Sequence, residues 1–260
     1  MTEISPAFVT VVSLLFGAAI GSFLNVCIYR LPVKMSVVHP RSRCPGCGYV
    51  LTWKDNIPVV SYLLLGGRCR SCGIPISMQY PIIEAVTAAI FLLHWYVLGP
   101  SWLLPVRLLF ACALIVLFMI DLEHQILPDV ITLPGIVLGF AFSLFLPPGP
   151  IMSAAGAVVG GGILWGIAEV WFRLRKVEAM GFGDVKMLAM VGAFLGLKLV
   201  IFTFVASSFI GGLIAAGLVA TRRADLATKV PFGTMLAAGA LAASLWGEPI
   251  VTWYLRLSNL

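Results

Sequence analysis

The chain contains only 11 acidic residues, and the candidates for a catalytic role lie in two short segments. Asp121, Glu123 and Asp129 lie in one segment, and Asp184 lies in the other, within Gly181-Phe182-Gly183-Asp184. Two neighbouring carboxyl groups can share one proton, so that one acts as a base toward water while the other protonates a carbonyl oxygen or a leaving amine. Asp121 and Asp184 are therefore the candidate catalytic residues, and the chemistry is that of an aspartic protease.

Helix-end electrostatics separate these candidates. Asp129 follows Pro128 and opens an expected helix, so we expect its carboxylate to cap free backbone N–H groups. Asp184 also begins an expected helix, after two glycines, and capping is the alternative role there. Asp121 ends an expected helix, where the macrodipole disfavours a carboxylate. A carboxylate at this unfavourable position indicates a functional role. On this argument Asp184 is the ionised member of the pair and Asp121 holds the proton.

Three further titratable residues lie near the ends of expected helices. His124 follows Asp121 by three residues and is either a proton partner or, as we expect, an interfacial side chain. Glu84 and Glu169 could equally be interface residues.

Four of the six cysteines form two pairs in one polar segment, Cys44-Pro45-Gly46-Cys47 and Cys69-Arg70-Ser71-Cys72, each followed by a glycine. Four thiolates suit tetrahedral Zn²⁺, and the 21 residues between the pairs are one more than the usual range of about 15–20. The predicted metal ligands are Cys44, Cys47, Cys69 and Cys72. Because four thiolates leave no open coordination position, this zinc would be structural and not hydrolytic. Two disulfides are the alternative, which a reducing cytoplasm disfavours.

The composition indicates that a lipid bilayer surrounds the elements that must position these residues. Hydrophobic residues make up 60% of the 260 residues and charged residues 11%, and the mean hydropathy is +1.04. A soluble domain could hardly tolerate these values. The first apolar run, from about Phe8 to Ile28, is too long for a signal-peptide core and follows no basic stretch, so we expect a retained membrane helix.

The apolar runs predict an all-α polytopic membrane protein with about eight transmembrane helices. The expected helices lie near residues 6–28, 81–98, 102–120, 130–147, 151–172, 186–197, 199–220 and 231–254. This divides the chain into a first transmembrane helix (1–28), a small zinc-binding segment (29–80) and a transmembrane peptidase domain (81–260). Glycines recur four residues apart at several places, for example at Gly156 and Gly160, and this spacing lets helices approach closely in lipid.

The basic residues predict the orientation in the membrane. Of the 17 lysines and arginines, 14 fall in the segments 29–80, 173–186 and 221–230. The positive-inside rule places these segments in the cytoplasm and, with eight crossings, both termini outside. The 121–129 and 173–185 loops, which carry the two aspartates, are then cytoplasmic too. A net charge of +6 reports this orientation, and no base-reading motif suggests a nucleic-acid partner.

Taken together and in this order, these motifs resemble the bacterial type IV prepilin peptidase family, the prepilin leader peptidase/N-methyltransferases, which are membrane aspartyl proteases of the GxGD type. The resemblance covers nearly the whole chain. Its matching stretches are Gly21 to Val26 with Arg30-Leu31-Pro32, the two cysteine pairs, Asp55-Asn56-Ile57-Pro58 with Ser61-Tyr62, Gly67-Arg68-Cys69, Asp121 to Asp129, and Gly181 to Lys186.

The resemblance implies an inner-membrane enzyme of type IV pilus or type II secretion systems. It would remove a short basic leader from prepilins or pseudopilins on the cytoplasmic side, with Asp121 and Asp184 matching the catalytic aspartates. The resemblance also implies N-methylation of the new N-terminal residue by S-adenosylmethionine, an activity associated with the cysteine-bearing segment. No G-x-G-x-x-G loop occurs in 29–80, so the residues alone do not indicate that activity. Asp55 stands where many relatives carry Glu, and Gly67-Arg68 where a Gly-Lys pair is common.

Two other classes of protein compete with this interpretation. A transporter also uses intramembrane acids and broken helices, but its acids tend to lie near the bilayer midplane, whereas these aspartates fall at helix ends. A zinc-dependent scaffold protein of a secretion apparatus would use the carboxylates only to cap helices. Such a scaffold would tolerate asparagine at positions 121 and 184, and a protease would not.

Overall fold

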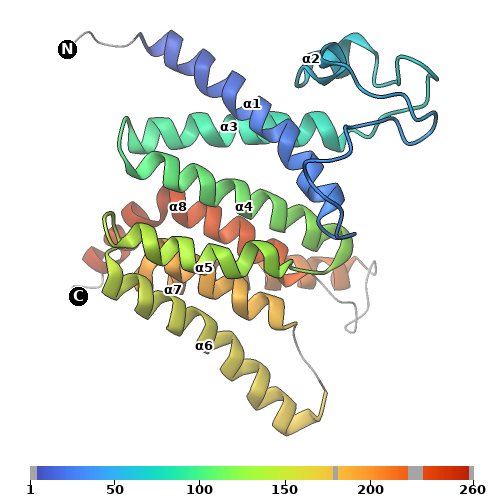
Figure 1. Ribbon diagram of the computed structural model, residues 1–260. Helices are drawn as coiled ribbons and strands as arrows, with labels where there is room; N and C mark the ends of the chain where they lie inside the picture. The colour runs from blue at the N-terminus through green and yellow to red at the C-terminus, as the bar shows by residue number, and fades with distance from the viewer. Residues whose placement is uncertain (1–4, 178–180, 222–230, 258–260) are drawn as a thin grey trace. The chain divides into compact units, whose positions relative to one another are not determined.

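The structure, a computed structural model, describes residues 5–177, 181–221 and 231–257. These residues form eight α-helices and one short 3₁₀ helix, and no strand is present among them (Figure 1). The prediction of an all-α chain is therefore confirmed. Contacts divide the chain into two compact units, Met1–Leu104 and Pro105–Leu260. The division into 1–28, 29–80 and 81–260 follows the expected membrane boundaries instead and stays a prediction.

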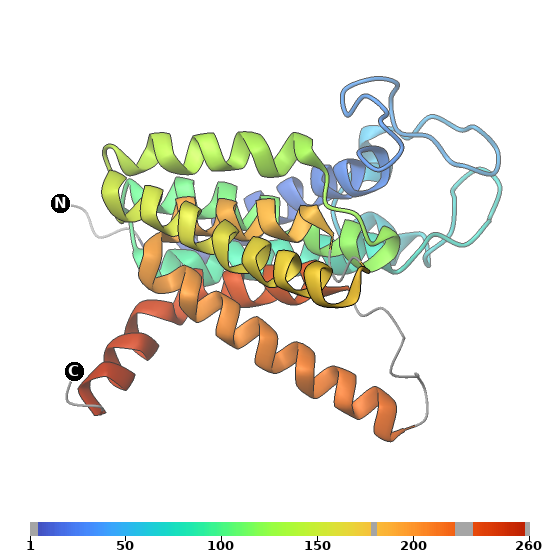
Figure 2. The same ribbon diagram turned by 90° about the horizontal axis from the view of Figure 1, so that it is seen from below.

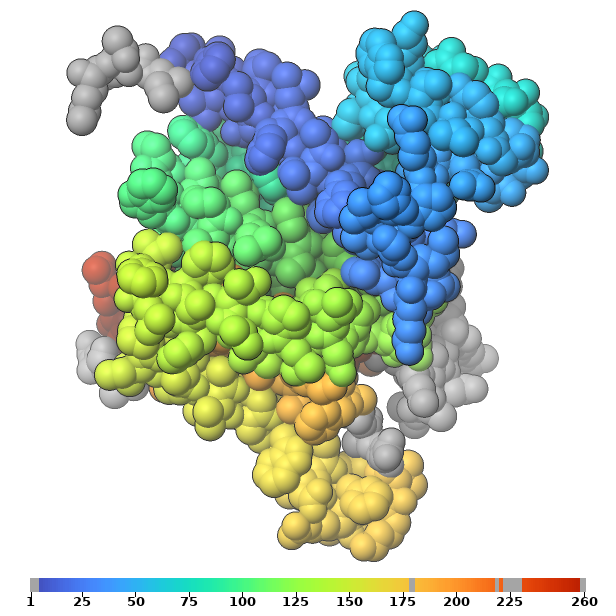
Figure 3. Space-filling model, in the orientation of Figure 1, coloured from blue at the N-terminus to red at the C-terminus, as the bar shows by residue number. Residues whose placement is uncertain are grey.

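The first unit contains a pair of long apolar helices and the polar segment between them. α1 (Pro6–Arg30) packs along α3 (Gln79–Leu98), and the intervening segment carries η1 (Trp53–Asn56) and α2 (Val60–Leu64). Figure 3 shows this segment, in sky blue and cyan, as a lobe beside one end of α1. The short helix α2 was not expected, because five residues are too few to show a helical period within a polar segment.

Glycine allows α1 and α3 to approach closely. A Cβ atom on Gly17 would lie 2.7 Å from the Cα of Ala88, and one on Gly21 would lie 2.7 Å from the Cα of Glu84. The same device joins α6 and α7, where a Cβ on Gly160 would lie 2.7 Å from the backbone oxygen of Leu188. The predicted role of these small residues in helix packing is confirmed at these positions.

The second unit is a bundle around a common apolar core. It contains α4 (Leu103–His124), whose first two residues precede the unit boundary, α5 (Asp129–Ser143), α6 (Pro150–Arg175), α7 (Phe182–Ala220) and α8 (Phe232–Leu257). α7 packs against α5, α6 and α8. Side chains from α4, α6, α7 and α8 form the buried core, in which the rings of Phe110 and Phe194 stack with centroids 4.7 Å apart.

α7 changes direction at Gly196, whose φ of 81° and ψ of 175° break the helix (Figure 2). Two helices, 186–197 and 199–220, were expected with a turn near Lys198, so the break lies two residues earlier than expected. The first half also begins earlier, at Phe182. Only glycine adopts this backbone conformation without strain, which is why the turn occurs here.

Six helices of the described chain are long and apolar enough to cross a bilayer: α1, α3, α4, α6, α7 and α8. α5 is apolar but has only 15 residues. The apolar stretch of α7 has 36 residues, far more than the roughly 20 needed for one crossing, and it breaks at Gly196. With the halves of α7 counted separately and α5 included, the described chain has about the eight segments expected. The chain is a multi-pass membrane protein.

Candidate active site and metal centre

Asp121 lies in the last turn of α4 and is only 5% exposed. The helix ends at His124, and Gln125 adopts a left-handed conformation with φ of 54° while its N–H donates to the backbone oxygen of Asp121 at 2.9 Å. This ending turns the chain away so that the Asp121 side chain stays inside the bundle. The expected position at a helix end is confirmed.

The start of α8 binds the Asp121 carboxylate. The backbone N–H of Thr234 donates to Oδ2 at 2.6 Å, and the Thr234 hydroxyl donates to the same oxygen at 2.9 Å. Thr234 is the third residue of α8, so its N–H belongs to the first turn, whose N–H groups have no partner within the helix. The positive end of the α8 dipole therefore faces Asp121, which offsets the unfavourable end of α4.

Asp184 is the third residue of α7 and is 9% exposed. Gly183, which precedes Asp184, and Gly233, which lies against Asp121, both pack on the Leu127 side chain, so the two aspartates are neighbours. Its backbone N–H donates to the oxygen of Gly181 at 3.2 Å, but the described residues supply no hydrogen-bond donor to the side chain. The capping role considered for Asp184 is therefore not observed, and the two aspartates lie in one buried site.

Leu127, in the loop between α4 and α5, lies between the starts of α7 and α8. A Cβ atom on Gly183 would lie 2.9 Å from Leu127 Cβ, and one on Gly233 would lie 2.9 Å from Leu127 Cδ1. The Gly233 Cβ would also lie 3.0 Å from Asp121 Cγ. Glycine at both positions therefore allows the starts of α7 and α8 to close around Leu127 and the carboxylates.

Asp129 does not cap its helix, contrary to the expectation from the sequence. Pro128 is the N-cap residue of α5, and the Asp129 side chain makes no capping hydrogen bond. Both of its carboxylate oxygens instead accept from Lys186 Nζ, at 2.7 and 2.8 Å. This ion pair joins the first turn of α5 to α7 at Lys186, two residues beyond Asp184.

The other titratable residues fall outside this site. The His124 side chain is 45% exposed and lies 3.9 Å from Glu123, in agreement with an interfacial role. Glu84 is 7% exposed and accepts the backbone N–H of Val59 at 2.7 Å, so it is a buried structural residue of the first unit.

The two cysteine pairs adopt the same local structure. In the first, Cys44 N–H donates to the Tyr49 oxygen and Gly48 N–H to the Cys44 oxygen, at 2.9 and 3.0 Å. In the second, Cys69 donates to Ile74 and Gly73 to Cys69 at the same two distances. Gly48 and Gly73 have φ of 73° and 72°, which explains the glycine after each pair.

These two turns bring four sulfur atoms together. The Sγ atoms of Cys44, Cys47, Cys69 and Cys72 all lie within 4.8 Å of one another, and none of these cysteines is in a disulfide. The sulfurs of a zinc tetrahedron with Zn–S bonds of about 2.3 Å are about 3.8 Å apart. Cys44 and Cys72 are separated by 3.8 Å, so the cluster fits the expected metal, whereas the disulfide alternative is not observed.

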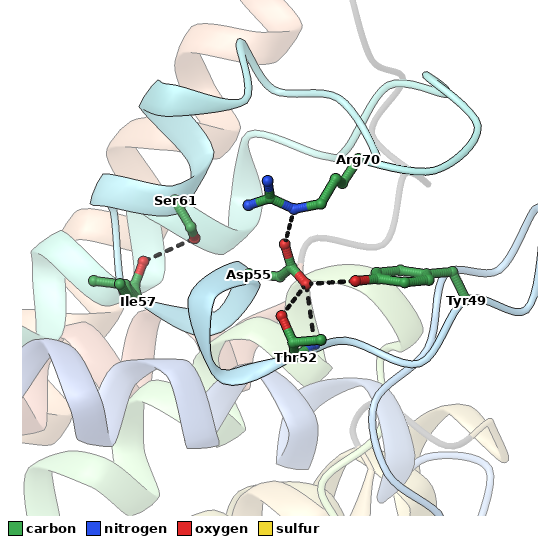
Figure 4. A network of polar contacts seen from close by, with 6 residues as sticks. All are labelled: Tyr49, Thr52, Asp55, Ile57, Ser61 and Arg70. Atoms are coloured by element: carbon green, nitrogen blue, oxygen red, sulfur yellow. Dashed lines mark hydrogen bonds and ion pairs between the residues drawn. The ribbon is translucent and has the colours of Figure 1, made fainter.

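Asp55 connects the two cysteine turns (Figure 4). Its carboxylate accepts from the hydroxyl of Tyr49, just after the first pair, at 3.1 Å and from Arg70 Nε, inside the second pair, at 2.6 Å. It also accepts from the Thr52 hydroxyl at 2.6 Å and the Thr52 N–H at 3.0 Å. The Asp55 side chain is 1% exposed. The donors of Thr52 and then of Arg70 hold the pKa of Asp55 well below its usual range.

Sequence reasoning missed Leu127, Gly233, Thr234 and the linking role of Asp55. The only local signal for Gly233 and Thr234 is a Gly-Thr pair at the start of an apolar run, which is typical of a helix N-terminus and says nothing about Asp121. The resemblance included Asp55 in a matching stretch but gave it no role.

Comparison with known sequences agrees with this geometry. Residues 15–98 match the profile of the bacterial peptidase A24 N-terminal domain, and residues 108–216 match that of the type IV leader peptidase family. A prepilin leader peptidase/N-methyltransferase of Aeromonas hydrophila is 36% identical over 269 residues, which cover 93% of this chain and 92% of the relative. Proteins of the same name from Pseudomonas aeruginosa and Myxococcus xanthus are 36% and 40% identical, over 95% and 82% of this chain and 93% and 64% of the relatives. No solved structure matches the chain significantly.

Proposed function

This chain belongs to the type IV leader peptidase family, and we propose that it removes the leader from type IV prepilins or pseudopilins with Asp121 and Asp184 as its catalytic residues. One observation carries this proposal: α4 and α7 hold these two carboxyl groups buried beside Leu127, against which the starts of α7 and α8 both pack. Paired carboxyl groups of this kind hydrolyse peptide bonds.

We assign different roles to the two acids from their hydrogen bonds. Thr234 donates twice to Asp121, which stabilises its carboxylate, whereas Asp184 has no donor among the described residues. Asp121 is then the ionised base and Asp184 carries the proton, the reverse of the assignment expected from helix ends alone. Asp121 takes a proton from water while the water oxygen bonds to the scissile carbonyl carbon, and Asp184 protonates the carbonyl oxygen. The C–N bond breaks as the leaving amine takes a proton from Asp121 and one hydroxyl of the tetrahedral intermediate returns its proton to Asp184, which restores the starting state of both acids.

We propose that the four cysteines hold a structural Zn²⁺. All four ligands come from the protein, so the ion has no open position for water or substrate and takes no part in hydrolysis. It would stabilise a segment of about 50 residues that is too small to build a core of its own.

The Asp55 contacts give a test of this metal site. The variant Asp55→Asn loses the charged acceptor of Arg70 and Thr52, and we expect zinc affinity to fall roughly 10- to 100-fold, as it does when outer-shell partners are lost. Competition with a chromophoric chelator measures this directly, and Asp129→Asn is the matched control. Unchanged affinity in Asp55→Asn would exclude a role for Asp55 in holding the two turns together.

We also propose that the chain methylates the new N-terminal residue of its product with S-adenosylmethionine as methyl donor. The name shared by the relatives, prepilin leader peptidase/N-methyltransferase, supports this proposal, as does the presence of the cysteine-bearing segment. The donor would supply an electrophilic methyl group. The N-terminal amine of the product would take the methyl group as its C–S bond breaks, which would leave the donor as a neutral thioether, and the amine would then lose a proton.

For the topology we propose an inner-membrane protein with both termini outside the cytoplasm. The basic residues of segments 29–80 and 173–186 support this orientation. Arg222, Arg223 and Lys229, which also entered the charge count, lie outside the described residues. Asp121 and Asp184 would then meet a substrate at the cytoplasmic face.

A reconstituted assay tests the proposed activity. The purified protein in liposomes is incubated with a prepilin and S-adenosylmethionine, and product masses are recorded. We expect a mass loss equal to the leader and a gain of one methyl group. The family resemblance implies cleavage just after a glycine that precedes the substrate's hydrophobic helix, so a prepilin with this glycine replaced is the control. An intact substrate in every reaction would refute the peptidase proposal, and cleavage without the methyl group would refute only the methyltransferase proposal.

A further inference from the structure

The short helix α2 presents an apolar face that the described residues do not cover. Val60, Leu63 and Leu64 follow the i, i+3, i+4 spacing and are 48%, 70% and 81% exposed. Tyr62 points to the opposite side, where its hydroxyl donates to the oxygen of Ile76 at 3.3 Å. α2 is therefore amphipathic, although it lies in a segment that the sequence places outside the membrane.

A hydrogen bond ties the start of α2 to a membrane helix. The N–H of Val59, which precedes α2, donates to Glu84 Oε2 at 2.7 Å. Glu84 is the sixth residue of α3, so it lies about 7 Å along the helix axis from Gln79. α3 has 20 residues, about the number needed to cross the hydrocarbon core, so nearly all of its length is needed for the crossing. α2 therefore begins at or just below the membrane surface, at the Gln79 end of α3 (Figure 1).

The backbone at this contact is held in an unusual conformation. Val59 has φ of 61° and ψ of −49°, and the N–H of Val60 donates to the oxygen of Pro58 at 2.6 Å, which closes a γ-turn. A β-branched residue seldom adopts positive φ, and such a conformation persists only where the surroundings fix it. The buried Glu84 carboxylate supplies one such contact. The hydrogen bond to Glu84 and the turn at Val59 therefore fix the direction of α2 relative to α3.

The neighbouring 3₁₀ helix carries residues typical of a membrane interface. η1 packs beside α2, and its Trp53 is 72% exposed. The Lys54 ammonium lies 5.6 Å from the centre of the Trp53 ring. Exposed tryptophan and lysine side chains are characteristic of the headgroup region of bilayers.

We propose that α2 is an interfacial membrane helix, with Val60, Leu63 and Leu64 inserted at the boundary between lipid headgroups and acyl chains. Its partner is the lipid surface itself, at the leaflet that contains the Gln79 end of α3. Helices of this kind bury their apolar face about 5–10 Å deep, in keeping with the level of Glu84. The contact would hold the tetra-cysteine segment against the membrane, and the inference does not depend on the proposed peptidase activity.

Photocrosslinking from the two faces of α2 tests this inference. Benzoyl-phenylalanine replaces Leu63, Leu64 or Tyr62 in the full chain, and the protein is irradiated in liposomes of phosphatidylethanolamine and phosphatidylglycerol. Val158, 74% exposed on α6, provides the positive control within a membrane span. Adducts are identified by mass, and zinc content and elution in detergent confirm that each variant is folded.

We expect positions 63 and 64 to give at least about fivefold more lipid adduct than position 62, because only the first two face the acyl boundary. Lipid adducts at position 158 but none at 63 or 64 would overturn the inference. Crosslinks from 63 and 64 to a second copy of the chain would also overturn it, in favour of a protein contact on this face.

Discussion

Asparagine in place of either Asp121 or Asp184 should lower the rate of leader removal about 1,000-fold. In the proposed mechanism each acid moves a proton during peptide hydrolysis, and a single positioned acid or base contributes roughly 10²- to 10⁴-fold. Asparagine keeps the size of the side chain but can neither accept a proton as a base nor donate one as an acid. Single-turnover cleavage of a prepilin in liposomes measures the rate.

Asp129→Asn is the matched control because it makes the same chemical change at an acid outside the proposed catalytic pair. Asp129 instead forms an ion pair with Lys186. The Asp129 side chain is 55% exposed, and pairs of this kind contribute little, so we expect less than about a fivefold loss. If Asp121→Asn or Asp184→Asn cleaved as fast as this control, the assignment of the catalytic pair would be wrong.

Valine at position 233 should lower leader removal about 100-fold while the protein remains folded. Even a Cβ atom at this position would lie 3.0 Å from the Asp121 Cγ and 2.9 Å from Leu127 Cδ1, and valine adds two methyl groups. The start of α8 must then move away and take the Thr234 donors with it. A displacement of about 1 Å at catalytic groups can cost 10²-fold in rate.

Gly162→Val controls for the loss of a helical glycine, because a Cβ at Gly162 would meet nothing within 4 Å. We expect its cleavage rate and its thermal unfolding temperature to match those of the unmodified protein. Gly233→Ala should fall between Gly233→Val and the unmodified protein, since Leu127 can shift to admit one methyl group. A full cleavage rate in Gly233→Val would show that the α8 start does not position Asp121.

The sequence predicted the parts of this protein that depend on local pattern. The lengths of the apolar runs predicted the long helices, and the spacing of the cysteines predicted a four-cysteine cluster that the structure contains. Asp121 and Asp184 could be selected because ionisable groups are rare in so apolar a chain.

The sequence could not predict contacts between distant helices. Thr234 donates to Asp121 across 113 residues, and the protonation roles that we propose from this contact are the reverse of those that helix ends alone suggest. Asp129 looked like a helix cap, but Lys186 provides a charged partner that local reasoning does not see. α2 escaped notice because its apolar residues are too few to show a helical period, and the proposal that it lies at the membrane surface rests on a distant contact, the hydrogen bond from Val59 to Glu84.

The two other classes of protein are less consistent with these observations. A transporter would place its acids near the bilayer midplane, whereas Asp121 lies in the last turn of α4 and Asp184 in the first turn of α7. A scaffold would use both carboxylates as caps, but the described residues provide Asp184 with no capping contact. Membership in a peptidase family agrees with the catalytic interpretation.

The most direct test of the central claim, that Asp121 and Asp184 act as one catalytic unit, is the leader-removal rate of the double variant Asp121→Asn/Asp184→Asn beside the two single variants. Losses from residues that act together do not multiply, so the double variant should be within about threefold of the slower single variant. If the two losses multiplied, the carboxyl groups would act independently. If the double variant cleaved at the unmodified rate, neither would be catalytic.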